Sequence, residues 1–175
     1  MLDLLRQERT VDTLQDRVAQ LYEESRNDVY RYLLTLGLYP PRAQEAVQEV
    51  FLRLYTTLKK GEVIENYKGW IFRVAHNHGL KVRARQSTEG PFDASLAAGL
   101  QAAAPNPETA LLDRERLLRF HHAVEGLSEQ QKRCLFLRLE GLQYREIGAA
   151  LGISASAVGE FLRRATMRLR KVRNE

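Results

Sequence analysis

Residues 134–173 read CLFLRLEGLQYREIGAALGISASAVGEFLRRATMRLRKVR, and this stretch predicts a helix-turn-helix. A first helix is expected from Tyr144 to Leu151 and is expected to end at Gly152, because glycine readily takes the left-handed conformation that terminates helices. Ser154 is expected to be the N-cap of a second helix, since its hydroxyl can accept a hydrogen bond from a backbone N–H of the first turn. The pattern therefore predicts two helices joined by a short turn.

The second predicted helix has one apolar face and one basic face. Its apolar residues recur at spacings of four, three and four, as expected for a helix face packed on a core: Val158, Leu162, Ala165 and Leu169. Its remaining face and tail are basic: Arg163, Arg164, Arg168, Arg170, Lys171 and Arg173. A turn followed by a basic helix is typical of proteins that place side chains in the major groove and bind phosphates. The pattern predicts DNA binding; a packing unit with a solvated charged face is the alternative.

Composition indicates a globular protein of one or two small domains. The chain has 175 residues, 44% of them hydrophobic, and a formal net charge of +5. The single cysteine, Cys134, excludes an intramolecular disulfide and is expected to be a reduced thiol in the core. No apolar run approaches the roughly 20 residues of a membrane span, and the first residues do not resemble a signal peptide. A cytoplasmic protein without membrane insertion is expected.

The chain is expected to be all-α, with two small helical domains joined by a flexible linker. The linker, residues 87–107, is rich in glycine, proline and small residues and has no basic side chain. The sequence on either side shows no sustained alternation of period two, which argues against strands. The expected domains are residues 1–86 and 108–175.

Three helices are expected in the first domain. The first ends at Gly37, the second runs from about Arg42 to Gly61, and the third begins after Gly69. The third helix is expected to bury one apolar face, with Trp70 at its entrance: Ile71, Val74, Ala75, His78 and Val82. His78 is therefore expected to be a core histidine.

Two further helices are expected before the helix-turn-helix. One runs from about Pro107 to Leu127. The next is introduced by Ser128 and Gln131, whose side chains can each satisfy a backbone amide in a capping box, and it ends at Gly141.

Residues 66–86, NYKGWIFRVAHNHGLKVRARQ, combine aromatic rings with five basic side chains and contain no acidic residue. Aromatic faces can stack on unpaired bases while cations bind their backbone, so the segment predicts binding of single-stranded nucleic acid. The alternative is that Trp70 and its apolar neighbours are core residues. Asn77 is the polar candidate of most interest, because an amide can read the edge of a base.

Five segments, in this order, resemble extracytoplasmic-function (ECF) sigma factors of bacterial RNA polymerase: LYEESRNDVYRYLL, AQEAVQEVFLRLY, GWIFRVAHN, LSEQQKRCLFLRLEGLQYREIGAALGIS and AVGEFLRRATMRLR. The similarity covers residues 15–86 as region two of the family and 108–173 as region four. It implies a non-catalytic subunit that binds core polymerase, recognises the upstream promoter element with region four and opens the minus-ten element with region two. The implied partners are the clamp helices of the largest polymerase subunit, the polymerase flap, promoter DNA and an anti-sigma factor.

The resemblance also assigns residues to three surfaces. For the upstream duplex these are Ser154, Ser156, Glu160, Arg163, Arg164 and Arg168. For the melted strand they are Tyr67, Lys68, Arg73, Asn77, Lys81, Arg83 and Arg85. For core polymerase they are Glu45, Gln48, Glu49 and Arg53.

The segment Gly159-Glu160-Phe161 departs from the family, which tends to have a Lys-Ser-Arg type of run there. Glu160 would repel phosphates, or it would read a base by accepting a hydrogen bond from a cytosine amino group. Two other functions therefore stay open. One is a stand-alone helix-turn-helix regulator similar to the output domain of LuxR-type proteins, and the other is a sigma-like protein that binds polymerase without reading promoters.

No metal site, cofactor or enzymatic activity is expected. The pairs His76 with His78 and His121 with His122 do not converge on one ion at their spacings, and no HExxH motif is present. Neither a glycine-rich phosphate loop nor a nucleophile elbow occurs.

Overall fold

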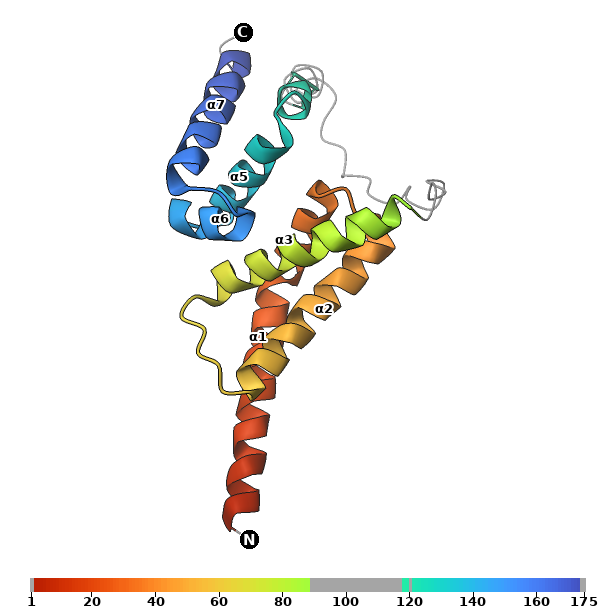
Figure 1. Cartoon of the computed structure of the whole chain (residues 1–175), viewed down its shortest axis with the longest axis vertical. Helices are drawn as coiled ribbons and strands as arrows, with labels where there is room; N and C mark the ends of the chain where they lie inside the picture. The colour runs from red at the N-terminus through yellow and green to blue at the C-terminus, as the bar shows by residue number, and fades with distance from the viewer. Residues whose placement is uncertain (1, 89–117, 120, 174–175) are drawn as a thin grey trace, which may run out of the picture. The chain divides into compact units, whose positions relative to one another are not determined.

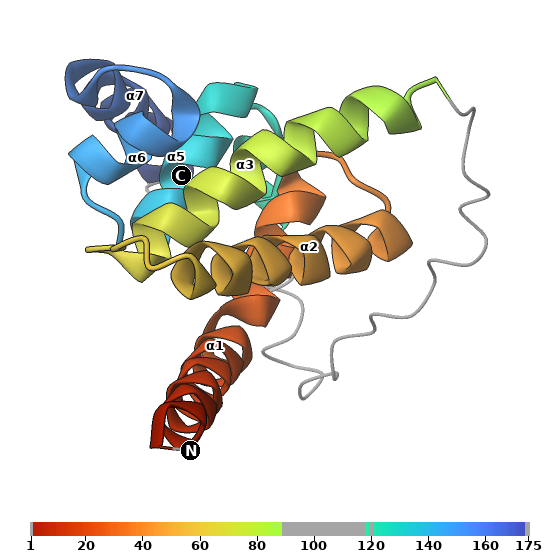
Figure 2. The same cartoon turned by 60° about the horizontal axis from the view of Figure 1, so that its bottom comes forward.

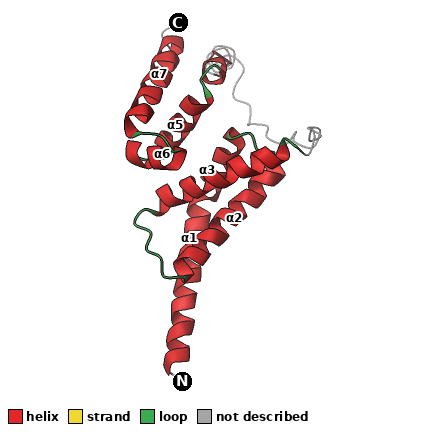
Figure 3. Ribbon diagram, in the orientation of Figure 1, coloured by secondary structure: helices red, strands yellow, loops and turns green. Residues whose placement is uncertain are grey.

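The computed structural model describes residues 2–88, 118–119 and 121–173, and gives only the backbone for residues 2–13 and 172–173. Every regular element in this part of the chain is a helix (Figure 3), as the sequence predicts. The helices are α1 Leu2–Thr35, α2 Pro40–Lys59, α3 Tyr67–Gln86, α5 Glu129–Leu139, α6 Tyr144–Leu151 and α7 Ala155–Arg173. Residues 118–119 and 121–125 are also helical, whereas the beginning of the helix expected from Pro107, and the linker, lie outside the described residues. The chain divides into two compact units, each described by itself below.

The amino-terminal unit is a three-helix arrangement in which α1 packs against α2 and α3, and α2 packs along α3 (Figures 1 and 2). Tyr32 and Leu33 of α1 are fully buried, as are Leu54 of α2 and Phe72 of α3. The Tyr32 and Phe72 rings meet edge to face, with centroids 5.6 Å apart, a favoured arrangement for aromatic pairs. Burial of these large side chains holds α3 against α1.

The turns of this unit follow the expected glycine signals. Gly37 and Gly61 have φ values of +89° and +80°, the left-handed conformation that glycine adopts without steric cost. Two helix starts differ from the sequence prediction. Helix α2 begins at Pro40 rather than near Arg42, since prolines are tolerated in the first turn, where the backbone N–H groups have no intrahelical acceptor. Helix α3 begins at Tyr67 because Asn66 caps it, accepting a hydrogen bond of 2.9 Å from the Gly69 amide.

The buried face of α3 is rotated from the predicted one. His76, not His78, is the core histidine: it is 4% exposed, and its Nδ1 lies 2.9 Å from the Tyr32 hydroxyl. His78 is half-buried, as are Val74 and Val82. The reason is a close approach at Gly79, where an added Cβ would lie 2.7 Å from a methyl carbon of Leu33 on α1. The side of α3 that carries this glycine therefore faces α1.

In the carboxy-terminal unit, Ser128 and Gln131 form the predicted capping box at the start of α5. The Gln131 amide donates to the Ser128 hydroxyl at 3.2 Å, and the Ser128 amide donates to the Gln131 side chain at 2.9 Å. Helix α5 ends at Leu139, two residues before Gly141, whose φ is +87°. Helix α5 packs on α7 and buries Cys134 completely. Burial raises the pKa of this thiol to about 11, as expected for an inert core cysteine.

The predicted helix-turn-helix is present as α6, a tight turn and α7. Gly152 has a φ of +70°, and the Ile153 amide donates to the Gly148 carbonyl oxygen at 3.0 Å. An added Cβ at Gly148 would lie 2.6 Å from the Ile153 carbonyl oxygen. The turn thus depends on the absence of a side chain at Gly148 as well as on the conformation of Gly152. On α7, Val158, Leu162 and Ala165 are buried, as predicted.

Candidate nucleic-acid interface

The first turn of α7 presents two serines. The Ser154 hydroxyl accepts a hydrogen bond of 3.1 Å from the Ala157 amide, so Ser154 is the predicted N-cap. Its oxygen lies 3.0 Å from the hydroxyl of Ser156, which is exposed one position into the helix. Of the two serines assigned to duplex binding, Ser154 has a structural role in the helix start, and Ser156 lies at the exposed edge of the first turn.

Glu160 holds two of the predicted DNA-binding arginines. Arg163 donates through Nε to Oε2 and through Nη2 to Oε1, both at 2.9 Å, which is a bidentate ion pair. Arg164 donates through Nε to Oε1 at 2.7 Å. These bonds lower the pKa of the Glu160 carboxyl to about 2, with the bond from Arg163 as the largest cause. The three side chains form one exposed cluster on α7, named here the Glu160 cluster.

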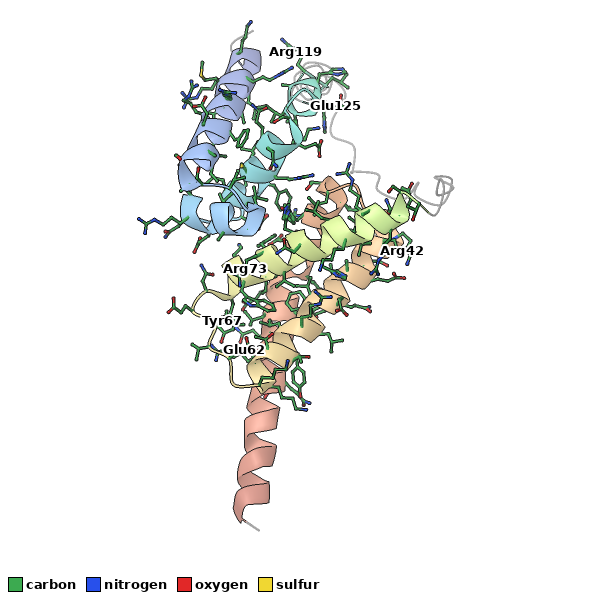
Figure 4. All side chains as sticks on the ribbon, viewed as in Figure 1. Arg42, Glu62, Tyr67, Arg73, Arg119 and Glu125 are labelled. Atoms are coloured by element: carbon green, nitrogen blue, oxygen red, sulfur yellow. The ribbon has the colours of Figure 1, made fainter. Side chains whose placement is uncertain are left out.

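Arg168 makes a different contact. Its guanidinium occupies the space that a side chain at position 126 would fill, so Arg168 covers Gly126, just beyond the helix of residues 121–125. Figure 4 shows the side chains of this unit and labels Glu125 next to that position. Arg168 therefore packs on Gly126, whereas Arg163 and Arg164 pair with Glu160.

Helix α3 carries an exposed polar stripe. Arg73, Asn77 and Lys81 follow one another at intervals of four residues, so they share one side of the helix, and all three are exposed. Figure 4 shows Arg73 extending from α3. This stripe lies on the side of α3 opposite to the buried residues Ala75 and Gly79. Three of the residues assigned to the melted strand thus form one surface.

The other residues of that set include Arg85, which continues the four-residue spacing of the stripe. Tyr67 is half-buried, and the guanidinium of Arg17 on α1 lies over its ring at 4.6 Å from the centroid. Arg83 is exposed but lies near Gly37, with its Nε 3.5 Å from where a Cβ on that glycine would be. Lys68 and Arg85 are both exposed. The contact between Arg17 and Tyr67 could not be predicted from the sequence, because a cation–π pair between two helices depends on how those helices pack.

A groove of about 440 Å³ lies between α2 and α3. It is lined by residues from both the predicted polymerase-binding set and the predicted strand-binding set. Glu49 and Arg53, assigned to polymerase, and Asn77, assigned to DNA, all line it. Arg53 donates to Glu49 at 2.7 Å. Trp70, for which the sequence left open a role in stacking on a base or a place in the core, is half-buried and forms part of the groove wall. The candidate polymerase surface and the candidate strand surface are therefore contiguous.

A second groove, of about 330 Å³, lies farther along the same two helices. It is lined by Arg42, Glu45 and Glu49 of α2 and by His78 and Arg85 of α3, among others. Arg42 pairs with Glu45 at 3.2 Å. Burial lowers the pKa of His78, with a smaller contribution from the positive charge of Arg53.

Gln48 belongs to a different groove. It lines a largely apolar hollow of about 530 Å³ between α1 and α2, together with Tyr22, Phe51 and Leu52. Gln48 lies three positions after Glu45 on α2 and both are exposed, so the grooves along α1 and α3 lie on either side of one exposed face of α2.

Two negative findings apply to the described part of the chain only. Residues 2–88, 118–119 and 121–173 contain no cluster of three His, Cys, Asp or Glu side chains arranged to hold a metal ion. Over these same residues, no helix combines the length and the apolar character needed to cross a membrane.

Comparison with known proteins gives two family matches in one order. The model of sigma-70 region 2 matches residues 21–88, and that of sigma-70 region 4 matches residues 117–169. The ECF RNA polymerase sigma factor SigM of Bacillus subtilis is 27% identical over 159 residues, which cover 90% of this chain and 95% of SigM. The chain belongs to the ECF sigma factors. Like its family, this ECF sigma factor is a promoter-specific transcription initiation factor that binds RNA polymerase, and the family is non-enzymatic.

Two solved structures share the fold of this sigma factor. One is CnrH in complex with the cytosolic domain of CnrY, with a TM-score of 0.59, 18% identity, and coverage of 91% of this chain and 89% of that chain. The other is the sigma factor RpoE in complex with the anti-sigma factor NepR from Bartonella quintana, with a TM-score of 0.61, 20% identity, and coverage of 89% and 96%. At these identities the likeness concerns the fold.

Proposed function

We propose that this sigma factor uses its two units on two forms of promoter DNA, with α7 binding the duplex of the upstream element and α3 binding the melted strand of the minus-ten element. The observation that carries the proposal is the exposed stripe Arg73–Asn77–Lys81 in the region 2 match, followed along the chain by the helix-turn-helix in the region 4 match. The proposed boundaries are residues 1–86 and 108–175 for the two domains and 87–107 for the linker.

The stripe on α3 suits an opened strand. Two cations spaced along one exposed helix face can bind phosphates of one strand, and an amide between them can form hydrogen bonds with a base edge. Trp70, at the groove beside Asn77, offers part of an aromatic face for an unpaired base. We assign Lys68 and Arg85 to supporting phosphate contacts, and Tyr67 and Arg83 to the margins of this surface.

Helix α7 suits a duplex. Ser156 is exposed at the edge of the first turn, where a recognition helix approaches the base edges, and Arg163 and Arg164 follow two turns later. The main role assigned to Arg168 is packing over Gly126, and a phosphate contact is its lesser role.

Core polymerase is proposed to bind the exposed side of α2, with Glu45, Glu49 and Arg53 facing the clamp helices of the largest subunit and region 4 facing the flap. Gln48 would contact the same partner from the α1 side. Because the groove beside Glu49 and Arg53 also contains Asn77, polymerase and the opened strand would lie next to each other. Because bacterial RNA polymerase acts in the cytoplasm, a protein that binds it would be cytoplasmic.

An anti-sigma factor is the remaining proposed partner. It is supported by the two fold relatives, whose structures contain the cytosolic domain of CnrY and the anti-sigma factor NepR.

Reconstitution with core polymerase on a library of promoters tests the proposal. Transcripts that start at defined sites only when the protein is added are expected. Duplex binding without polymerase and no transcript would indicate a stand-alone regulator instead. Core binding with no transcript from any promoter would indicate a sigma-like protein that does not read promoters.

A further inference from the structure

The Glu160 cluster places a carboxylate at the centre of the basic surface of α7. Glu160 is 42% exposed, and its side chain accepts three hydrogen bonds from Arg163 and Arg164. An anion here reduces the charge that the two arginines present to DNA from +2 to +1. A surface adapted only to grip phosphates would not carry such a group, because each neutralised phosphate adds affinity.

The bonds of the cluster decide which edge of Arg163 is presented. A guanidinium has five N–H groups. Glu160 binds the edge formed by Nε and Nη2, and Nη1 donates to the Met167 sulfur at 3.1 Å, a weak acceptor. One N–H on each terminal nitrogen, Nη1 and Nη2, then stays available to a ligand. Two parallel N–H groups at the end of an arginine match the O6 and N7 acceptors of guanine.

We propose that Glu160 is a positioning residue that makes α7 selective: its charge weakens the attraction of Arg163 and Arg164 to phosphates, and its bonds orient Arg163 toward a guanine in the upstream duplex. The inference deepens the proposed duplex-binding role of α7 and rests on it. Glu160 acts here through the arginines and does not itself contact the base.

The energetic consequence is a penalty on binding at arbitrary sites. Either arginine can bind a phosphate with the N–H groups that Glu160 leaves available, but the Glu160 carboxylate then lies close to the phosphate and repels it. A guanine at the correct position has no net charge and is not repelled in this way, while the pair with Glu160 persists. Discrimination between sequences therefore comes partly from weakening non-specific contacts, a recognised route to specificity.

The test uses holoenzyme, formed from core polymerase and the full chain. Wild-type holoenzyme first selects duplexes from a library randomised across the upstream element. Binding to the selected duplex and to a scrambled duplex is then measured between 50 and 300 mM KCl for wild type, Glu160→Gln, Glu160→Asp and the control Glu125→Gln. The control changes the net charge equally at an exposed glutamate outside α7. Thermal unfolding of each variant verifies its fold.

Glu160→Gln is expected to tighten binding to the scrambled duplex about three- to tenfold and to lower the ratio of specific to non-specific affinity by a similar factor. Its salt dependence is expected to steepen by about one phosphate contact, a change of about 0.9 in the log–log slope. Glu160→Asp, which keeps the charge, is expected to restore most of the ratio, and Glu125→Gln is expected to behave as wild type.

Three results would overturn the inference. If Glu160→Gln matches Glu125→Gln in slope and ratio, Glu160 does not position the arginines. If Glu160→Gln loses specific binding while its affinity for the scrambled duplex stays unchanged, the carboxylate reads a base directly. Both results leave the proposed function intact. If wild-type holoenzyme selects no upstream sequence at all, the duplex-reading role fails, and the inference fails with it.

Discussion

Gln86, at the last position of α3, is the side chain whose loss should most directly loosen the candidate strand-binding helix. It is 8% exposed and forms two hydrogen bonds with the turn between α1 and α2. The Tyr39 amide donates to its Oε1 at 2.9 Å, and its Nε2 donates to the Gly37 carbonyl oxygen at 2.9 Å. Gln86→Leu removes both bonds with little change in size.

Each such bond contributes about 1 kcal/mol net, so the substitution should destabilise the amino-terminal unit by about 2 kcal/mol. For a unit of this size, that loss lowers the melting temperature by about 10 °C. The chain has a single tryptophan, Trp70, which is half-buried at the start of α3. Urea unfolding followed by tryptophan fluorescence therefore reports on this unit alone.

Gln44→Leu is the matched control, because Gln44 is exposed on α2 in the same unit. It should change the free energy of unfolding by less than about 0.5 kcal/mol. If Gln86→Leu were as mild as Gln44→Leu, the two hydrogen bonds would not stabilise the unit, and the reasoning would be refuted.

The remaining predictions concern function, pH and reactivity. Asn77→Ala and Lys81→Glu should each slow promoter opening about tenfold, equivalent to about 1.4 kcal/mol, while core binding stays within about twofold; equal loss of both in open-complex and core-binding assays would contradict the assignment. Because the folded state lowers the pKa of His78, the unfolded state binds more protons near pH 6, so stability should fall as the pH drops below about 6.5. His78→Gln should flatten this dependence in urea midpoints at pH 5.5 and 7.5, and a wild-type midpoint that does not change would speak against it. Cys134, with its pKa raised from 9.0 to about 11, should react with iodoacetamide at pH 8 about a hundredfold more slowly than in the unfolded chain; rapid labelling of the native protein would show that the thiol is accessible.

Local signals predicted the helices well. Gly37, Gly61, Gly141 and Gly152 mark chain turns where the sequence placed helix ends, and all four have positive φ. The capping box at Ser128 was also predicted correctly. These features depend on one residue type and its immediate neighbours, which is information that a single sequence contains.

Which face of α3 is buried could not be predicted from such local signals. Apolar residues lie around much of its first half, so the periodicity does not identify one face. The choice between His76 and His78 depends on how closely α1 approaches Gly79. Contacts between elements were missed for the same reason, including the pair of Arg17 with Tyr67. The bonds from Glu160 to Arg163 and Arg164 lie within one helix at spacings of three and four, and those spacings could have indicated them.

Because Arg168 lies over Gly126, a residue outside α7 decides how far one positive charge extends from that helix. Any side chain introduced at position 126 would occupy the place of the guanidinium and force it outward. Related chains could therefore adjust how strongly this helix attracts nucleic acid without altering a single residue of the helix itself. The φ of this glycine is not positive, so a substitution there would not strain the backbone. It would nevertheless move the Arg168 guanidinium and so change how strongly α7 attracts phosphates.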